Sequence, residues 1–234
     1  MWKRIAGAIL LAATVALPVL LTEQALRMPP ERRPEPDRSK AQDIANATGT
    51  AWSEAEITAP DGAKLRGWAF LPPAERDSGK AILLLHGAGD SRKGMLGFTR
   101  FFAQRGYATL AVDSRGHGIS GGPMVTYGLL ERGDGLPAFF SRPVVSAAFD
   151  YAQMRYGFDL EAISPLESLK RAHTPVLLIH GLADGRTAPE QSRELYAVNP
   201  KVAELWEVPG AKHVQAPVVA EQEFEKRVLR GFDK

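Results

Sequence analysis

The chain has 234 residues, 44% of them hydrophobic, so it can bury a sizeable core and is not disordered throughout. Its formal net charge is only +2, so we expect no nucleic-acid partner. Cysteine is absent, as are metalloprotease, P-loop and dinucleotide-binding motifs, which excludes disulfides and thiolate metal sites and predicts neither metal nor cofactor.

The N-terminal segment is apolar. Lys3 and Arg4 precede an uncharged run of 18 residues, Ile5 to Thr22, a length that can span a bilayer as a helix. We therefore predict a single-pass membrane anchor over residues 1–22. A cleaved signal peptide is the alternative, although residues 23–27 contain no clean A-x-A cleavage site. Lys3 and Arg4 favour a cytoplasmic N-terminus, whereas the five basic residues between 27 and 40 favour the opposite orientation, and we expect the domain to lie outside the cytoplasm.

Prolines mark the next stretch. Four of them stand among charged residues between Met28 and Pro36. Such a composition cannot build a core and is typical of an extended, semi-rigid linker. The sequence therefore predicts a linker over residues 23–50 and one folded domain over residues 51–234.

The predicted domain opens with a hairpin. Residues alternate from Glu54 to Leu71 around Asp61-Gly62, a strong turn signal. Helical spacing of apolar residues predicts helices near residues 95–105 and 222–232. Continuous apolar runs predict buried strands of a largely parallel sheet at residues 80–86, 107–112, 175–181 and 203–208. A hairpin followed by alternating strands and helices indicates the α/β class.

Four segments of this α/β pattern resemble the α/β-hydrolase superfamily. "LLLHGAGDSR" (83–92) resembles its third strand and oxyanion loop, and "LAVDSRGHGISGG" (110–122) its fourth strand and following loop. "PVLLIHGLAD" (175–184) resembles its seventh strand, and "VPGAKHV" (208–214) its histidine loop. The resemblance covers residues 57–232 and is nearest to lipase, esterase and peptidase-like members with an N-terminal anchor.

This resemblance implies a serine hydrolase that acts on small-molecule esters or amides without a cofactor. In such enzymes a serine attacks the acyl carbon, a histidine moves its proton, and a carboxylate orients the histidine. By position, Asp184 would be the acid and His213 the base. Ala88 and Gly89 would lie in the loop whose backbone N–H groups face the oxyanion.

Ser120 is a doubtful nucleophile. Residues 118–122 match the pattern G-x-S-x-G, but a nucleophile elbow follows directly on a buried strand and opens a helix. Asp113 closes the predicted strand, six further residues (114–119) precede Ser120, and Gly121-Gly122-Pro123 does not begin a helix. We predict that the glycines permit an irregular connecting turn. Among the histidines, we expect His86 and His180 to be structural and His117 to be solvated.

The interval 114–174 contains no strand, G-x-S-x-G turn and helix in succession. Segments that resemble the regions before and after the elbow meet at Asp134-Gly135. We therefore predict an internally shortened fold in which strands five and six are missing. An evolved loss, a gene deletion and an assembly artefact all fit this pattern. Without those strands, the strand at 175–180 is expected to pair with the strand at 81–86.

Three functions are compatible with these residues. The first is family-level hydrolysis of an ester or amide. The second is a non-catalytic protein of hydrolase descent that binds a ligand or partner, and the third is an active esterase with Ser120 as a relocated nucleophile. The missing elbow favours an inactive protein, because a site without its nucleophile keeps only small residual catalysis.

Overall fold

The computed structural model describes residues 37–59, 62–87, 89–121, 150–151, 153–155 and 164–232, with a few positions between 16 and 23. The chain divides into two compact units, Met1–Leu130 and Glu131–Lys234, where the sequence predicted one domain from residue 51. The seam at Asp134-Gly135 and nearly all of the predicted anchor lie outside the described residues. Of the helices described, none is long and apolar enough to cross a membrane.

The first unit contains a four-stranded sheet of order β1-β2-β4-β3. Its strands are β1 (Ala51–Thr58), β2 (Lys64–Leu71), β3 (Ala81–Leu85) and β4 (Ala108–Val112). The predicted hairpin is confirmed, because β1 and β2 pair antiparallel and Gly62 has a φ of 84° in the turn. β3 and β4 pair in parallel, so the loops that follow them leave the same edge of the sheet.

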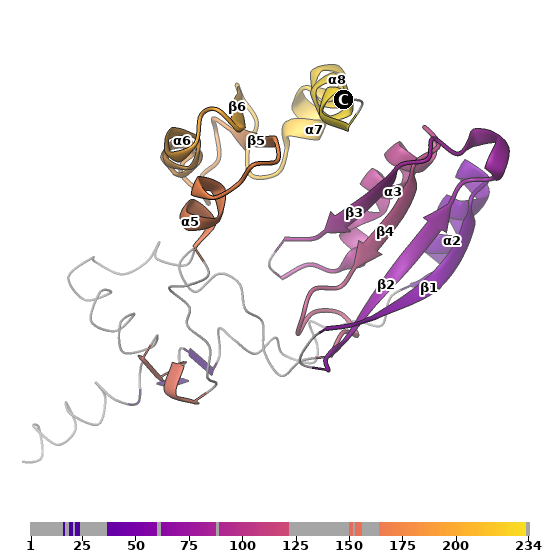
Figure 1. Cartoon of the computed structure of the whole chain (residues 1–234), viewed down its shortest axis with the longest axis horizontal. Helices are drawn as coiled ribbons and strands as arrows, with labels where there is room; N and C mark the ends of the chain where they lie inside the picture. The colour runs from indigo at the N-terminus through magenta and orange to yellow at the C-terminus, as the bar shows by residue number, and fades with distance from the viewer. Residues whose placement is uncertain are drawn as a thin grey trace, which may run out of the picture. The chain divides into compact units, whose positions relative to one another are not determined.

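Helices α2 (Arg38–Thr48) and α3 (Leu96–Ala103) cover one face of this sheet (Figure 1). Two short 3₁₀ helices, η2 (Ala74–Arg76) and η3 (Arg92–Met95), complete the unit. The Asp37 side chain caps α2 by accepting the Ser39 N–H. Helix α2 falls within the predicted linker, yet its buried Ala41 and Ala45 belong to the core cluster that also contains Trp68, Phe70 and Leu96. The linker prediction of residues 23–50 is therefore wrong at its C-terminal end.

The second unit contains a parallel pair, β5 (Val176–Gly181) and β6 (Ala203–Val208). Its helices are α5 (Pro165–Lys170), α6 (Pro189–Val198), α7 (Ala216–Val219) and α8 (Glu221–Phe232). Within this unit, α6 lies on one side of the strands and α7 and α8 on the other (Figure 1). Val208, Ala211 and Ala216 form its core, against which Ile179, Trp206 and Phe224 pack.

The α/β class, the parallel strand pairs and the flanking helices are as predicted, and the expected pairing of β5 with β3, which would join the two units, stays a prediction. β5 pairs with β6 in a two-stranded sheet, whereas β3 pairs with β4 in the four-stranded sheet. Each parallel pair is connected by a short crossover that contains one helix, α3 or α6. Such local units form from adjacent segments.

Candidate active site

The carboxyl ends of β5 and β6 bring the predicted acid and base together. Because the two strands are parallel, the turn after Gly181 and the loop after Val208 lie at the same edge. The Asp184 N–H donates to the Gly181 carbonyl at 3.1 Å, and the Ala183 N–H donates to the Ala211 carbonyl at 2.9 Å. The second bond ties the acid turn to the histidine loop.

Gly181 makes this close approach possible. A Cβ at this position would lie far inside van der Waals contact with the Ala211 carbonyl oxygen and 2.7 Å from the carbonyl oxygen of Lys212. Both neighbours are backbone atoms, which cannot rotate away as a flexible side chain can. The histidine loop can therefore pack against the end of β5 only if residue 181 is glycine.

Asp184 sits in a cradle of hydrogen bonds. Its Oδ2 lies 2.8 Å from His213 Nδ1 and accepts the Thr187 hydroxyl at 2.8 Å. Its Oδ1 accepts the backbone N–H groups of Arg186, at 2.8 Å, and Thr187, at 3.1 Å. Burial by itself would raise the pKa of this carboxyl, but the bonds from His213, Thr187 and Arg186 together hold the pKa well below its usual range. Asp184 is therefore a carboxylate at neutral pH.

His213 is oriented as a general base. A carboxylate only accepts hydrogen bonds, so the proton of a neutral His213 must be on Nδ1, which leaves Nε2 as a basic lone pair. The imidazole side chain is 38% exposed, whereas the Asp184 side chain is 4% exposed. A buried carboxylate behind a partly exposed imidazole is the arrangement that lets histidine take a proton from a nucleophile.

The residue after His213 holds a strained backbone. In the part of the chain that the structure describes, Val214 is the one non-glycine residue with a positive φ, 53°. A β-branched residue in this region costs on the order of 1–3 kcal/mol and persists only where its surroundings impose it. Here the turn is closed by the bond from the Gln215 N–H to the Lys212 carbonyl, at 3.1 Å. The strain thus lies in the turn that presents His213.

Two residues that sequence reasoning did not place in the site support the acid. Thr187 contributes both its N–H and its hydroxyl to Asp184. His180 Nε2 lies 3.0 Å from the Thr187 carbonyl, so Nε2 carries a proton and donates it there, and it lies 3.7 Å from Asp184 Oδ2. An aspartate whose side chain accepts the N–H groups two and three residues onward forms an Asx turn. This turn is the one local feature that could have indicated a role for Thr187.

These side chains line a shallow depression with Ile179, Lys212 and Val214. Two histidines and a carboxylate meet there, but no group of three or more metal-ligating side chains with suitable geometry occurs among the residues described. With Asp184 ionised and His213 Nε2 basic, the depression can accept and return a proton. It offers general acid–base chemistry at the edge of the sheet.

The predicted oxyanion residues belong to the first unit. Gly89 has a φ of 80°, and its N–H donates to His117 Nε2 at 3.3 Å, so in this structure that N–H is bonded to an imidazole and is not directed at an oxyanion. Ala88 lies outside the described residues. The expectation that His117 is solvated is wrong, because its exposed fraction is 0%. Its ring is buried between the loops that follow β3 and β4. No local sequence pattern predicts this contact between the two loops.

Ser120 also belongs to the first unit, in the loop after β4. Its side chain is 4% exposed. The hydroxyl donates to the Asp113 carbonyl at 2.7 Å and accepts the Arg66 N–H at 2.8 Å. The next residue, Gly121, bonds through its N–H to the Lys64 carbonyl at 2.7 Å. These contacts join the loop to β2.

The chain is similar to several known proteins. Residues 76–131 match the family described as serine aminopeptidase, S33. An esterase from Pyrococcus furiosus is 21% identical, with 81% of this chain and 93% of that chain covered and a TM-score of 0.58. A propionate-bound esterase from Thermogutta terrifontis is 16% identical over 76% of this chain and 92% of that one, with a TM-score of 0.52.

A membrane phospholipase A, described as a bacterial virulence factor, is 16% identical over 100% of this chain and 98% of that chain, with a TM-score of 0.52. No curated protein matches. Identities this low show the fold, and the matched segment contains β3, β4 and the loops that follow them. The chain therefore has the fold of the α/β-hydrolase superfamily.

Proposed function

We propose that this esterase-like chain keeps the acid–base half of a serine hydrolase site and forms no acyl-serine intermediate. One contrast carries the proposal. Asp184 and His213 are paired in the tautomer of a working general base, whereas the serine of the only G-x-S-x-G pattern is buried and bonded to backbone. Esters, the substrate class of the similar esterases, or amides are the small molecules that such a site would take.

The chemistry of the pair supports this assignment. His213 Nε2 can take a proton from a hydroxyl within about 2.6–3.2 Å, and the Asp184 carboxylate then stabilises the imidazolium. That step generates an alkoxide only where a serine is presented to the imidazole. Without it, no acyl–oxygen bond forms on the protein, and a bound ester meets only the small residual catalysis of a site without its nucleophile.

The alternative, an active esterase with Ser120 as nucleophile, requires that its hydroxyl leave both partners. The Arg66 N–H and the Asp113 carbonyl would then be left without these bonds, at about 1–3 kcal/mol for each buried group that finds no replacement. A nucleophile elbow instead holds its hydroxyl exposed on a sharp turn. The contacts of Ser120 therefore favour a protein in which Ser120 is not a nucleophile.

The test uses the full purified chain with short nitrophenyl esters and a fluorophosphonate probe. We expect no hydrolysis above background and no labelling, with circular dichroism and a cooperative melt to verify folding. His213→Ala and the exposed His173→Ala form a matched pair. Labelling that His213→Ala abolishes and His173→Ala preserves would overturn the proposal. Loss of that labelling in Ser120→Ala would then identify the nucleophile.

A membrane anchor is a separate proposal. We infer from the uncharged length of Ile5–Thr22 that this segment stays attached and holds the hydrolase-like part outside the cytoplasm. One similar structure is that of a membrane phospholipase A, which is consistent with an anchor. Membrane fractionation with N-terminal sequencing tests attachment, and protease accessibility in intact cells tests the side. A mature chain that begins near Leu26 would contradict the anchor.

A further inference from the structure

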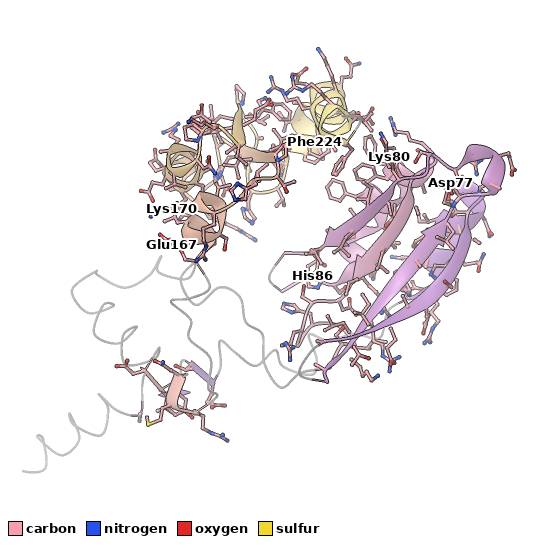
Figure 2. The ribbon with its side chains drawn as sticks, in the orientation of Figure 1. Asp77, Lys80, His86, Glu167, Lys170 and Phe224 are labelled. Carbon is pink, nitrogen blue, oxygen red and sulfur yellow. The ribbon has the colours of Figure 1, made fainter. Side chains whose placement is uncertain are left out.

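The loops after β3 and β4 exchange hydrogen bonds through two buried histidines. His86 follows β3, where Figure 2 labels it, and its Nε2 accepts the Ser114 N–H of the other loop at 2.9 Å. His117 lies in the loop after β4, and its Nε2 accepts the Gly89 N–H of the first loop at 3.3 Å. Each loop therefore supplies an imidazole that holds a backbone N–H of its neighbour.

The remaining ring nitrogens define the tautomers. His86 Nδ1 lies 2.8 Å from the Gly87 carbonyl, and His117 Nδ1 lies 3.0 Å from the Arg115 carbonyl. A carbonyl oxygen can only accept, so Nδ1 carries the proton in both rings. Both Nε2 atoms must lack a proton, because each accepts a backbone N–H. Both histidines are thus neutral, and their ring centroids lie 4.8 Å apart at an interplanar angle of 61°.

A buried carboxylate joins the same two loops. Asp113 Oδ1 accepts the Arg92 N–H of η3 at 2.7 Å, and its Oδ2 accepts the Ile119 N–H at 3.2 Å. Gly118 has a φ of 48°, and a Cβ there would collide with the Asp113 carboxylate. Two letters of the G-x-S-x-G pattern therefore have structural roles: Gly118 makes room for Asp113, and Ser120 bonds the loop to β2.

We propose that His117 is the positioning residue of the loop that follows β3. Its Nε2 holds the Gly89 N–H and thereby sets the direction of that peptide group, while His86 and Asp113 secure the loop that carries His117. We call these three side chains the His–Asp bracket. The proposal goes beyond the proposed function, because it concerns how the loop is held and not whether an ester is cleaved.

The first experiment needs no variant of the bracket to fold. The full chain is labelled with ¹⁵N-histidine, and ring nitrogen shifts and couplings are recorded at neutral pH. We expect two slowly exchanging histidines with a protonated Nδ1 and an unprotonated Nε2, assigned to His86 and His117 by elimination after substitution of the other three histidines, His173, His180 and His213. An Nε2–H tautomer or a doubly protonated ring at either position would overturn the proposal.

The second experiment measures amide hydrogen exchange in His117→Leu and His117→Gln. Leucine removes the acceptor, whereas the glutamine amide oxygen can reach the same place. We expect Gly89 exchange to rise about tenfold in the leucine variant, as for one lost hydrogen bond, and to recover in the glutamine variant. Ala111 in β4 serves as the reference for opening of the whole unit. His86→Leu should show the mirror effect at Ser114.

Unchanged Gly89 exchange in His117→Leu, with Ala111 also unchanged, would refute the positioning role. A rise in Ala111 exchange together with Gly89 exchange would mean that the whole unit opens in the leucine variant. The glutamine variant then provides the test, and a failure of His117→Gln to recover the protection of Gly89 would count against the proposal. None of these readouts involves ester turnover. An active chain with the predicted tautomers would therefore overturn the proposed function and leave this inference standing.

Discussion

Each unit contains an aspartate and a histidine, the residue types that accompany the serine in a serine hydrolase, and the first unit also contains the serine of the G-x-S-x-G pattern. The environments of these polar side chains differ between the two units. In the first unit, Asp113, His117 and Ser120 are buried, and each bonds to backbone groups. In the second unit, Asp184 is buried but His213 keeps more than a third of its side chain exposed. Burial with satisfied hydrogen bonds is typical of structural polar residues, whereas an imidazole that is partly exposed in front of a buried carboxylate can exchange a proton with a group outside the protein.

The sharpest way to break the second unit's site is Gly181→Ala. The added Cβ collides with the backbone of Ala211 and Lys212, so we expect a loss at the upper end of about 1–3 kcal/mol in the free energy of unfolding. Loss of the His213 Nδ1–H proton signal should accompany it. Gly185→Ala is the matched control, because a Cβ there has no atom within 4 Å. Equal stability of the two variants would contradict the close approach.

In the first unit, Ser120→Ala should destabilise the fold without changing any ester hydrolysis. The substitution removes one acceptor and one donor from buried backbone groups, which costs about 1–3 kcal/mol by chemical denaturation. Ser53→Ala, at an exposed position of β1, should stay within about 0.5 kcal/mol of the parent. A stable Ser120→Ala variant that loses probe labelling would show that Ser120 is a nucleophile and not a structural residue.

Acid should weaken the second unit's site through Asp184. The folded pKa of this carboxyl is lowered, so its ionised form stabilises the fold above the unfolded pKa of about 3.9, and this stabilisation is lost as the pH falls further toward the folded pKa. Asp184→Asn cannot titrate. Denaturation at pH 7, 5, 4 and 3 should show the stability gap between parent and variant closing below about pH 4. A constant gap would refute the hydrogen-bonded cradle.

The smallest expected effect concerns Thr187. Thr187→Val keeps the shape of the side chain but removes the hydroxyl donated to Asp184 Oδ2, which we expect to cost about 0.5–1.5 kcal/mol. Thr187→Ser restores the donor and should recover most of the loss. The His213 Nδ1–H proton, observed by NMR, should exchange faster in the valine variant only. Identical spectra in both variants would remove Thr187 from the site.

Several features could be predicted because they depend on neighbours in sequence. The hairpin around Gly62 follows from a turn dipeptide between alternating residues, and the buried strands follow from continuous apolar runs. Asp184 and His213 were chosen by resemblance, and in the structure Asp184 Oδ2 lies 2.8 Å from His213 Nδ1. Helix α2 was missed because its buried surface consists mainly of two small alanines, which leave little apolar signal in a polar segment.

The sequence by itself determined the α/β class and the strands, because periodicity and turn chemistry are local. Tertiary structure alone decided that β5 pairs with β6, that Gly181 admits the histidine loop, and that His117 is buried. Each of these depends on a partner far along the chain: the Gly89 N–H that His117 holds lies 28 residues earlier. Such contacts form only when separate loops leave the same edge of a sheet, and no local pattern of residues encodes that meeting.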